Sequence, residues 1–331
     1  MRAGVQAGEE TLAPRTALAL VALGAAVISV TALFVKWISL GPATIGAYRC
    51  AYAAAALGGW ILARRSLSTG PKGQVGASPR ALGFAVAAGV CFAGDLFVWH
   101  ESILLSGTGL ATLLANTQVF WVALLSALVL GERLHWRLAV CAALALLGVV
   151  LLAIPGLATG PLHLRGIGLG LATGVFYAGY YLCLRASQRE PRRLSIAANL
   201  FVVCATSALL LFAAALLAGE VVPWPGPRDL GLLLLLGVVA HVGGWVAISR
   251  GMTAVPAASG SLLLLLQPVL ATIWGVLIFA EPFGVYEISG TLLSLGAIYA
   301  AMLTRGDRSG SPATVRATVT MGATGLVSRT D

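Results

Sequence analysis

Apolar runs of membrane-spanning length follow one another along almost the whole chain. A helix needs about 20 apolar residues to cross the hydrocarbon core of a bilayer. Measured against that length, the sequence predicts about ten transmembrane helices. They are expected at residues 17–37, 44–63, 82–105, 108–130, 136–154, 166–184, 194–217, 230–250, 257–280 and 285–303. The predicted fold class is therefore an all-α polytopic membrane protein.

The polar positions inside these runs form a pattern that occurs twice. Gln118 precedes Glu132 by 14 positions, Gln267 precedes Glu281 by 14 positions, and the two blocks are 149 residues apart. This offset divides the chain into two repeats of five helices, residues 16–155 and 156–304. Because five is odd, the second repeat enters the membrane from the opposite side, which makes the repeats inverted.

Two segments flank the repeats. Residues 1–15 form a short N-terminal segment before the first apolar run. Residues 305–331 are rich in Ser, Thr, Gly and Ala and have no apolar period, so we expect a disordered tail.

Composition and charge fit this picture. The chain is 59% hydrophobic and only 10% charged, with a mean hydropathy of +0.93, whereas roughly a quarter of the residues of a soluble domain are charged. The net charge of +9 does not indicate a nucleic-acid partner, because the basic residues fall in short clusters between apolar runs. The five cysteines lie inside apolar runs without metal-site or redox spacing, so we predict neither a metal site nor a cofactor.

The basic clusters also predict the orientation. In the connections and at the ends of the spans, 17 lysines and arginines fall on one side of the membrane and three, Lys36, Arg165 and Arg228, on the other. Basic residues accumulate on the cytoplasmic side of membrane proteins. We therefore expect a multi-pass protein of the plasma (inner) membrane with both termini in the cytoplasm.

Charged residues inside the spans need a partner or a function, because a centred charge costs about 2.5–3.5 kcal/mol on insertion scales. Arg49 of the second span lies at a depth comparable with Asp95 and Glu101 of the third. A structural ion pair of Arg49 with Glu101, or with Asp95, would neutralise these charges. A role of Arg49 or the acids in binding a substrate carboxylate or coupling protons is the alternative.

Further polar and aromatic residues are candidates for a cavity at the membrane midplane. Asp95 and Trp99 are one helical turn apart on the third span, as are His241 and Trp245 on the eighth. Gln118 and Gln267 are counterparts in the two repeats. Inverted repeats place the substrate site at their interface. The predicted substrate-binding residues are Asp95, Trp99, Gln118, Tyr177, His241, Trp245 and Gln267.

Short sequence motifs add a family resemblance. The Gly131-Glu132-Arg133-Leu134 end of the fourth span, the Gln267-Pro268 pair and the Ala280-Glu281-Pro282 end of the ninth span resemble the EamA family of the drug/metabolite transporter superfamily, over residues 16–304. The first repeat departs from the pattern with Val119 in place of the proline. The resemblance implies a ten-helix, exporter-like carrier of small polar or amphipathic metabolites.

The predicted function is a secondary transporter that works by alternating access, with protons as one candidate coupling ion and the lipid bilayer as its environment. The alternatives are an intramembrane lipid-modifying enzyme and a non-transporting membrane scaffold. No enzyme is expected, because no His-x-x-x-His, Gly-x-Ser-x-Gly or Walker-type motif occurs. The sequence leaves open whether the chain acts alone or as a homodimer.

Overall fold

The computed structural model describes residues 13–67, 77–118, 120–122, 124–125, 136–252, 264 and 266–309. Several sequence predictions fall at least partly outside these ranges: residues 1–12 of the N-terminal segment, much of the fourth span with the Gly131–Leu134 motif and Glu132, the start of the ninth span, most of the connection between the second and third spans, and the tail beyond Ser309. Within the described residues all regular structure is helical, and no strand occurs. The all-α class is confirmed.

In both repeats most helices lie close to the predicted apolar runs. The fourth predicted span, residues 108–130, is an exception, because the helix that begins at Thr108 ends at Ala115 and residues 116 and 117 lie in a turn. The start of the ninth predicted span, residues 257–263, lies outside the described residues. The helices of the first repeat are α1 (Pro14–Ser29), α2 (Thr31–Trp37), α3 (Pro42–Leu67), α4 (Pro79–Ser106), α5 (Thr108–Ala115) and α7 (Trp136–Thr159). Those of the second are α8 (Pro161–Arg189), α9 (Ile196–Leu217), α10 (Pro227–Leu234), the π-helical segment η1 (Leu235–Gly243), α11 (Gly244–Met252), α13 (Leu266–Phe279) and α14 (Val285–Ser309). Five stretches in the described part are long and apolar enough to span a membrane: Arg15–Trp37, Pro79–Ser106, Pro161–Leu184, Ile196–Leu217 and Pro227–Ile248.

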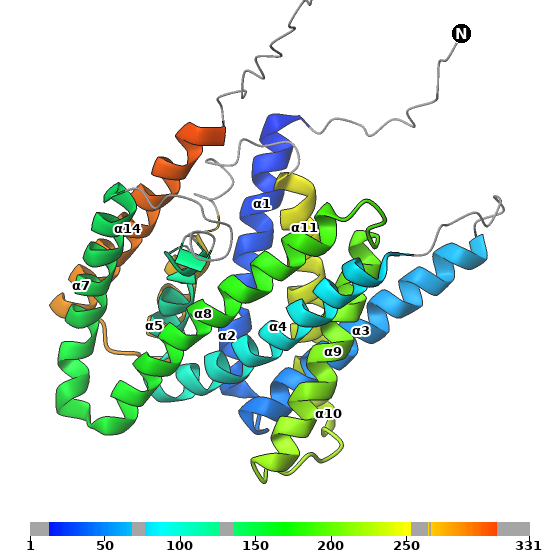
Figure 1. Cartoon of the computed structure of the whole chain (residues 1–331). Helices are drawn as coiled ribbons and strands as arrows, with labels where there is room; N and C mark the ends of the chain where they lie inside the picture. The colour runs from blue at the N-terminus through cyan, green and yellow to red at the C-terminus, as the bar shows by residue number, and fades with distance from the viewer. Residues whose placement is uncertain are drawn as a thin grey trace, which may run out of the picture.

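The packing of these helices has the symmetry of two related repeats. Helix α3 packs on its counterpart α9, α5 on α13, and α7 on α14. Helix α4, from the third span of the first repeat, packs on α8, the first helix of the second repeat. In the symmetric contact, α11, from the third span of the second repeat, packs on α1, the first helix of the first repeat (Figure 1). In the α1–α11 contact Gly24 faces Gly244 while Gly251 faces Ala17, so these helices are antiparallel. The two-repeat architecture predicted from the 149-residue offset is thus confirmed.

Glycines allow the closest helix approaches. A Cβ atom added at Gly166, Gly170 or Gly174 of α8 would lie within 3.0 Å of α4, α5 or the turn that follows α5. Small residues at four-residue spacing let membrane helices approach closely. The Gly-xxx-Gly steps along this helix therefore serve packing.

Besides the break after Ala115 in the fourth span, three features differ from the sequence-based expectation of uninterrupted spans. The first span breaks at Val30, where the hydroxyls of Ser29 and Thr31 donate to the carbonyls of Ala26 and Ile28. Such side-chain bonds to the preceding turn bend helices. The eighth span contains the π-helical segment η1. Helix α14 continues to Ser309, so the first residues of the predicted tail are helical; a helix does not have to end where its apolar run ends.

Candidate functional site

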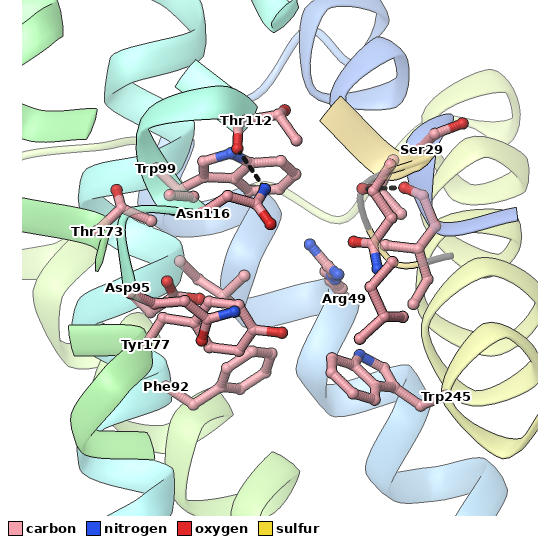
Figure 2. Close-up of a pocket in the computed structure, with 17 residues that line it drawn as sticks. Ser29, Arg49, Phe92, Asp95, Trp99, Thr112, Asn116, Thr173, Tyr177 and Trp245 are labelled. Carbon is pink, nitrogen blue, oxygen red and sulfur yellow. Dashed lines mark hydrogen bonds between the residues drawn. The ribbon is translucent and has the colours of Figure 1, made fainter. Parts of the chain in front are cut away.

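A cavity of about 90 Å³ lies between the two repeats. Figure 2 shows Arg49 projecting from α3 into its middle, with Asp95 and Tyr177 on one side and Ser29 and Trp245 on the other. The lining residues come from both repeats: Ile28, Ser29, Thr31, Arg49, Phe92, Asp95, Leu96, Trp99, Thr112, Ala115, Asn116, Gln118, Thr173, Tyr177, Trp245, Leu264 and Gln267.

Much of this lining consists of residues that are counterparts in the two repeats. Four pairs of lining residues are separated by the repeat offset of 149: Ile28 with Tyr177, Leu96 with Trp245, Ala115 with Leu264, and Gln118 with Gln267. Counterparts can meet around one space only if the axis relating the repeats passes through it. The cavity is therefore at the interface where inverted repeats hold their substrate sites.

Arg49 is the most buried charge in this lining, with 4% of its surface exposed. Its Nη2 lies 3.2 Å from Nδ1 of His241, while Nε and Nη1 have no hydrogen-bond partner. The guanidinium carbon is 5.8 Å from the centre of the Trp99 ring. The close approach of Gly237 in η1 to the Arg49 carbonyl brings α3 and η1 together at this point.

His241 lies behind Arg49 and does not line the cavity. Arginine has only donors, so Nδ1 of His241 must be the acceptor and carries no proton in this arrangement. Its Nε2 faces the Sγ of Cys204 at 3.7 Å, and its ring packs 5.3 Å from that of Phe92. His241 is therefore a neutral imidazole that orients the guanidinium.

The predicted ion pair between Arg49 and Glu101 is not formed. Neither Glu101 nor Asp95 lies within 4.0 Å of the guanidinium, whereas Lys36 and Glu281 do form an ion pair. Glu101 is six positions after Asp95, which on an α-helix turns it about 120° away from the Asp95 face. Asp95 instead lines the cavity opposite Arg49.

The structure brings six of the seven predicted site residues to the cavity, with His241 as the exception. It also adds Asn116, which is two positions before Gln118, a spacing that on a regular helix would turn the two side chains to different faces. Helix α5 ends at Ala115 and Asn116 lies in a turn, so the helical spacing rule does not apply there. The amide of Asn116 donates to the Thr112 carbonyl at 2.8 Å.

Sequence reasoning also missed the polar lining from the first span, Ser29 and Thr31. These residues mark the break between α1 and α2. Two hydroxyl residues separated by one valine in an apolar run were the available signal. They do not predict a break by themselves, because serine and threonine also occur inside regular membrane helices.

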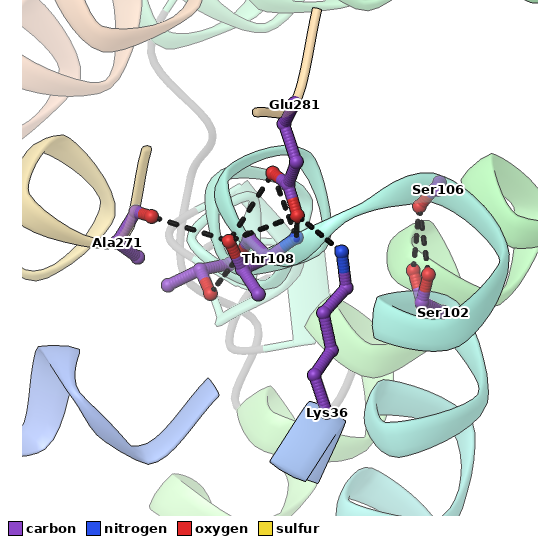
Figure 3. A network of polar contacts seen from close by, with 7 residues as sticks. Lys36, Ser102, Ser106, Thr108, Ala271 and Glu281 are labelled. Carbon is purple, nitrogen blue, oxygen red and sulfur yellow. Dashed lines mark hydrogen bonds and ion pairs between the residues drawn. The ribbon is translucent and has the colours of Figure 1, made fainter. Parts of the chain in front are cut away.

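A second polar cluster joins the ends of three helices (Figure 3). Glu281 accepts hydrogen bonds from the backbone N–H of Thr108 at 2.9 Å and pairs with Nζ of Lys36 at 2.5 Å. The Thr108 hydroxyl lies 3.2 Å from both Glu281 oxygens. The carboxylate thus sits at the N-terminus of α5, where the helix dipole favours negative charge, and ties α2, α5 and the end of α13 together.

The chemistry of the lining is that of a binding site. It offers indole and phenol rings, three side-chain amides and one residue of each charge. Among the described residues, no group of three His, Cys, Asp or Glu could hold a metal ion. The arrangement can bind a small solute by hydrogen bonds and aromatic contacts.

Comparison with known proteins gives a consistent result. The model of the EamA-like transporter family matches residues 15–154 and 164–303, one match for each repeat. The chain is similar to the uncharacterized protein PA1977 of Pseudomonas aeruginosa, with 32% identity over 71% of this chain and 79% of the relative. It is also similar to the uncharacterized transporter YwfM of Bacillus subtilis, with 30% identity over 36% of this chain and 39% of that protein.

The fold matches a solved crystal structure. The TM-score is 0.58 at 22% sequence identity, over 89% of this chain and 99% of the solved chain. At that identity the likeness concerns the fold alone.

Proposed function

Because the chain belongs to the EamA-like transporter family, we propose that it is a secondary transporter that exports a small polar or amphipathic metabolite across the plasma membrane by alternating access. Membership of a transporter family favours this function over the enzyme and scaffold alternatives. The observation that carries the proposal is the polar cavity lined by four pairs of counterpart residues from the two repeats.

The small volume of the cavity supports alternating access. Its volume of about 90 Å³ is well below the roughly 300–1,000 Å³ of typical ligand pockets, so binding a whole metabolite requires the repeats to move apart. The Lys36–Glu281–Thr108 cluster holds three helices together at one end of the bundle. Opening that end means breaking this cluster, while the cavity remains between the repeats.

The lining suits a small solute with polar groups and a flat apolar part. Trp99 and Trp245 offer apolar ring surface, and Asn116, Gln118 and Gln267 offer amide donors and acceptors. For a proton-coupled carrier, Asp95 is the better candidate for the coupling group. It lines the cavity, whereas His241 is turned away from it and holds Arg49.

Transport by purified protein in liposomes tests this function. We expect uptake from a panel of radiolabelled metabolites, reduced at least about tenfold by Gln118→Ala, Gln267→Ala and Asp95→Asn. Leu217→Ala serves as the control, because this side chain is 90% exposed on α9. Loss of proton-driven uptake in Asp95→Asn, with solute exchange retained, would identify the coupling group. Uptake of no panel member above empty liposomes would contradict the proposal.

The proposed orientation has its own test. In Figure 1, α1 begins and α14 ends at the same end of the bundle, and the 17-to-three distribution of basic residues assigns that end to the cytoplasm. Reporter fusions after residues 70, 190 and 310 should give cytoplasmic signals, and fusions after 160 and 225 external ones. A cytoplasmic signal from residue 160 would contradict the proposed topology.

A further inference from the structure

The guanidinium of Arg49 is a buried cation with unused donors. It is 4% exposed, and three of its five N–H bonds, those on Nε and Nη1, have no acceptor. Buried polar groups are normally hydrogen-bonded, and an isolated charge removed from water is costly. The protein thus retains a cation at the cavity that has three donors without an acceptor, and Figure 2 shows its guanidinium among the lining residues.

The arrangement around Arg49 fixes the direction of these donors. The bond from Nη2 to Nδ1 of His241 holds one corner of the planar group, and Cys204 and Phe92 enclose the imidazole from other sides. The Trp99 ring lies 5.8 Å from the guanidinium carbon. A donor group held in place before binding loses little freedom when an acceptor arrives.

Asp95, the other charged residue among the described lining residues, does not neutralise Arg49 by contact. No Arg49–Asp95 ion pair lies within 4.0 Å, although both side chains face the same cavity. The space between the two side chains can take a ligand group that accepts hydrogen bonds from Arg49. Its charge is limited to one, because a second negative charge would meet the Asp95 carboxylate.

We propose that Arg49 binds a single carboxylate of the transported metabolite, so that the cavity selects monocarboxylates over both neutral analogues and dianions such as phosphate esters. The two oxygens of a carboxylate can accept several guanidinium donors at once. This inference rests on the proposed transport function, for which Arg49 would be a specificity-determining residue. His241 would be a positioning residue for it.

The test is a binding comparison on the purified full-length protein in detergent. The probes are propionate and phenylacetate, their neutral counterparts propionamide and phenylacetamide, and the dianion phenyl phosphate, at constant ionic strength. Binding is measured as the rise in Tm and as quenching of tryptophan fluorescence, because Trp99 and Trp245 line the cavity. In the wild type we expect at least one carboxylate to bind about tenfold or more tightly than its amide and than phenyl phosphate.

Arg49→Gln should weaken carboxylate binding by about tenfold or more and leave the amide unaffected. Arg64→Gln is the matched control on the same helix, because Arg64 is exposed and lies over the Trp60 ring at 4.6 Å. If Arg49→Gln does not fold, Arg49→Lys keeps the charge but lacks the planar fork and should weaken binding measurably. Equal binding of carboxylates and amides by the wild type, or unchanged carboxylate binding in the Arg49 variants, would overturn the inference.

The two proposals fail separately. Liposome uptake of neutral solutes without any preference for carboxylates would leave the transport function standing and overturn the role of Arg49. Carboxylate binding that depends on Arg49, without uptake of any solute, would support the site and contradict the transport function.

Discussion

At the scale of single residues, Arg49 and His241 illustrate how hydrogen-bond chemistry decides charge states. A guanidinium cannot accept a hydrogen bond, so the neighbouring ring nitrogen of His241 must be unprotonated. The pair therefore carries one positive charge, located on Arg49. That charge faces the cavity, while the imidazole is enclosed between α3, α4 and α9.

Replacing His241 should reveal its positioning role. His241→Leu removes the acceptor of a buried charged donor and should lower the free energy of unfolding by about 1–3 kcal/mol. In His241→Gln the side-chain oxygen can still accept, so the loss should be smaller. Thermal unfolding in detergent measures both, with His163→Leu at the start of α8 as the control. Equal losses in the Leu and Gln variants would contradict the hydrogen-bond account.

At the scale of the helices, close contacts are made by glycine where both repeats meet. Helix α8 illustrates this with neighbouring positions: a Cβ atom at Gly170 would lie 2.6 Å from Cδ1 and 2.9 Å from Cβ of Leu114, whereas nothing lies within 4 Å of one at Gly168. The face of α8 that carries Gly170 thus has no room for an added methyl group. The face that carries Gly168 is open.

The two glycines give a matched pair of substitutions. Gly170→Ala should lower the free energy of unfolding by about 1–3 kcal/mol, because the added methyl group forces α5 or α4 outward. Gly168→Ala should be neutral or stabilising by up to about 1 kcal/mol, because alanine is the better helix former. The two variants are compared by thermal unfolding in detergent. A larger loss in Gly168→Ala would show that the packing of α8 is wrongly assigned.

The Lys36–Glu281–Thr108 cluster couples three helices, and its members are not equivalent. Glu281→Ala removes the acceptor of the Thr108 backbone N–H and also leaves Lys36 unpaired, so we expect a loss of about 1.5–3 kcal/mol. Lys36→Ala leaves the Thr108 bonds intact and breaks a partly exposed ion pair, so about 1 kcal/mol or less should be lost. Chemical unfolding of the two variants and the double variant measures the difference. A Lys36 effect equal to that of Glu281 would contradict this order.

At the scale of the whole molecule, the repeats share the shape of the cavity but not its charges. The four counterpart pairs supply rings, aliphatic groups and amides from both halves. Arg49 and Asp95 have Ala198 and Gly244 as counterparts in the second repeat, so both charges come from the first. A symmetric scaffold thus holds an asymmetric distribution of charge, and under the proposed role of Arg49 this asymmetry would select the charge of the solute.

Loosening one end of the bundle should change access to the cavity. In a chain carrying Asn116→Cys in the lining, Lys36→Ala should raise the rate of labelling by an impermeant maleimide added from outside about fivefold, the factor for roughly 1 kcal/mol of closed-state stability. The chain without the Asn116→Cys change controls for the native cysteines. An unchanged labelling rate would mean that the cluster stabilises the fold without closing the outer end.

The sequence alone determined the helical class, the repeat and most of the span positions, because a bilayer requires apolar helices of fixed length and a duplicated chain keeps its polar positions in register. Through the repeat it also placed the cavity and six of its lining residues.

Only the tertiary structure decided the partner of Arg49, because depth along a helix does not fix the rotation that turned Asp95 inward and Glu101 away. The Lys36–Glu281 pair likewise joins residues 245 positions apart, and the turn at Asn116 overrides helical spacing. These outcomes depend on how helices pack against one another. A hydropathy pattern records which segments can lie in a bilayer, but not which neighbour each residue meets.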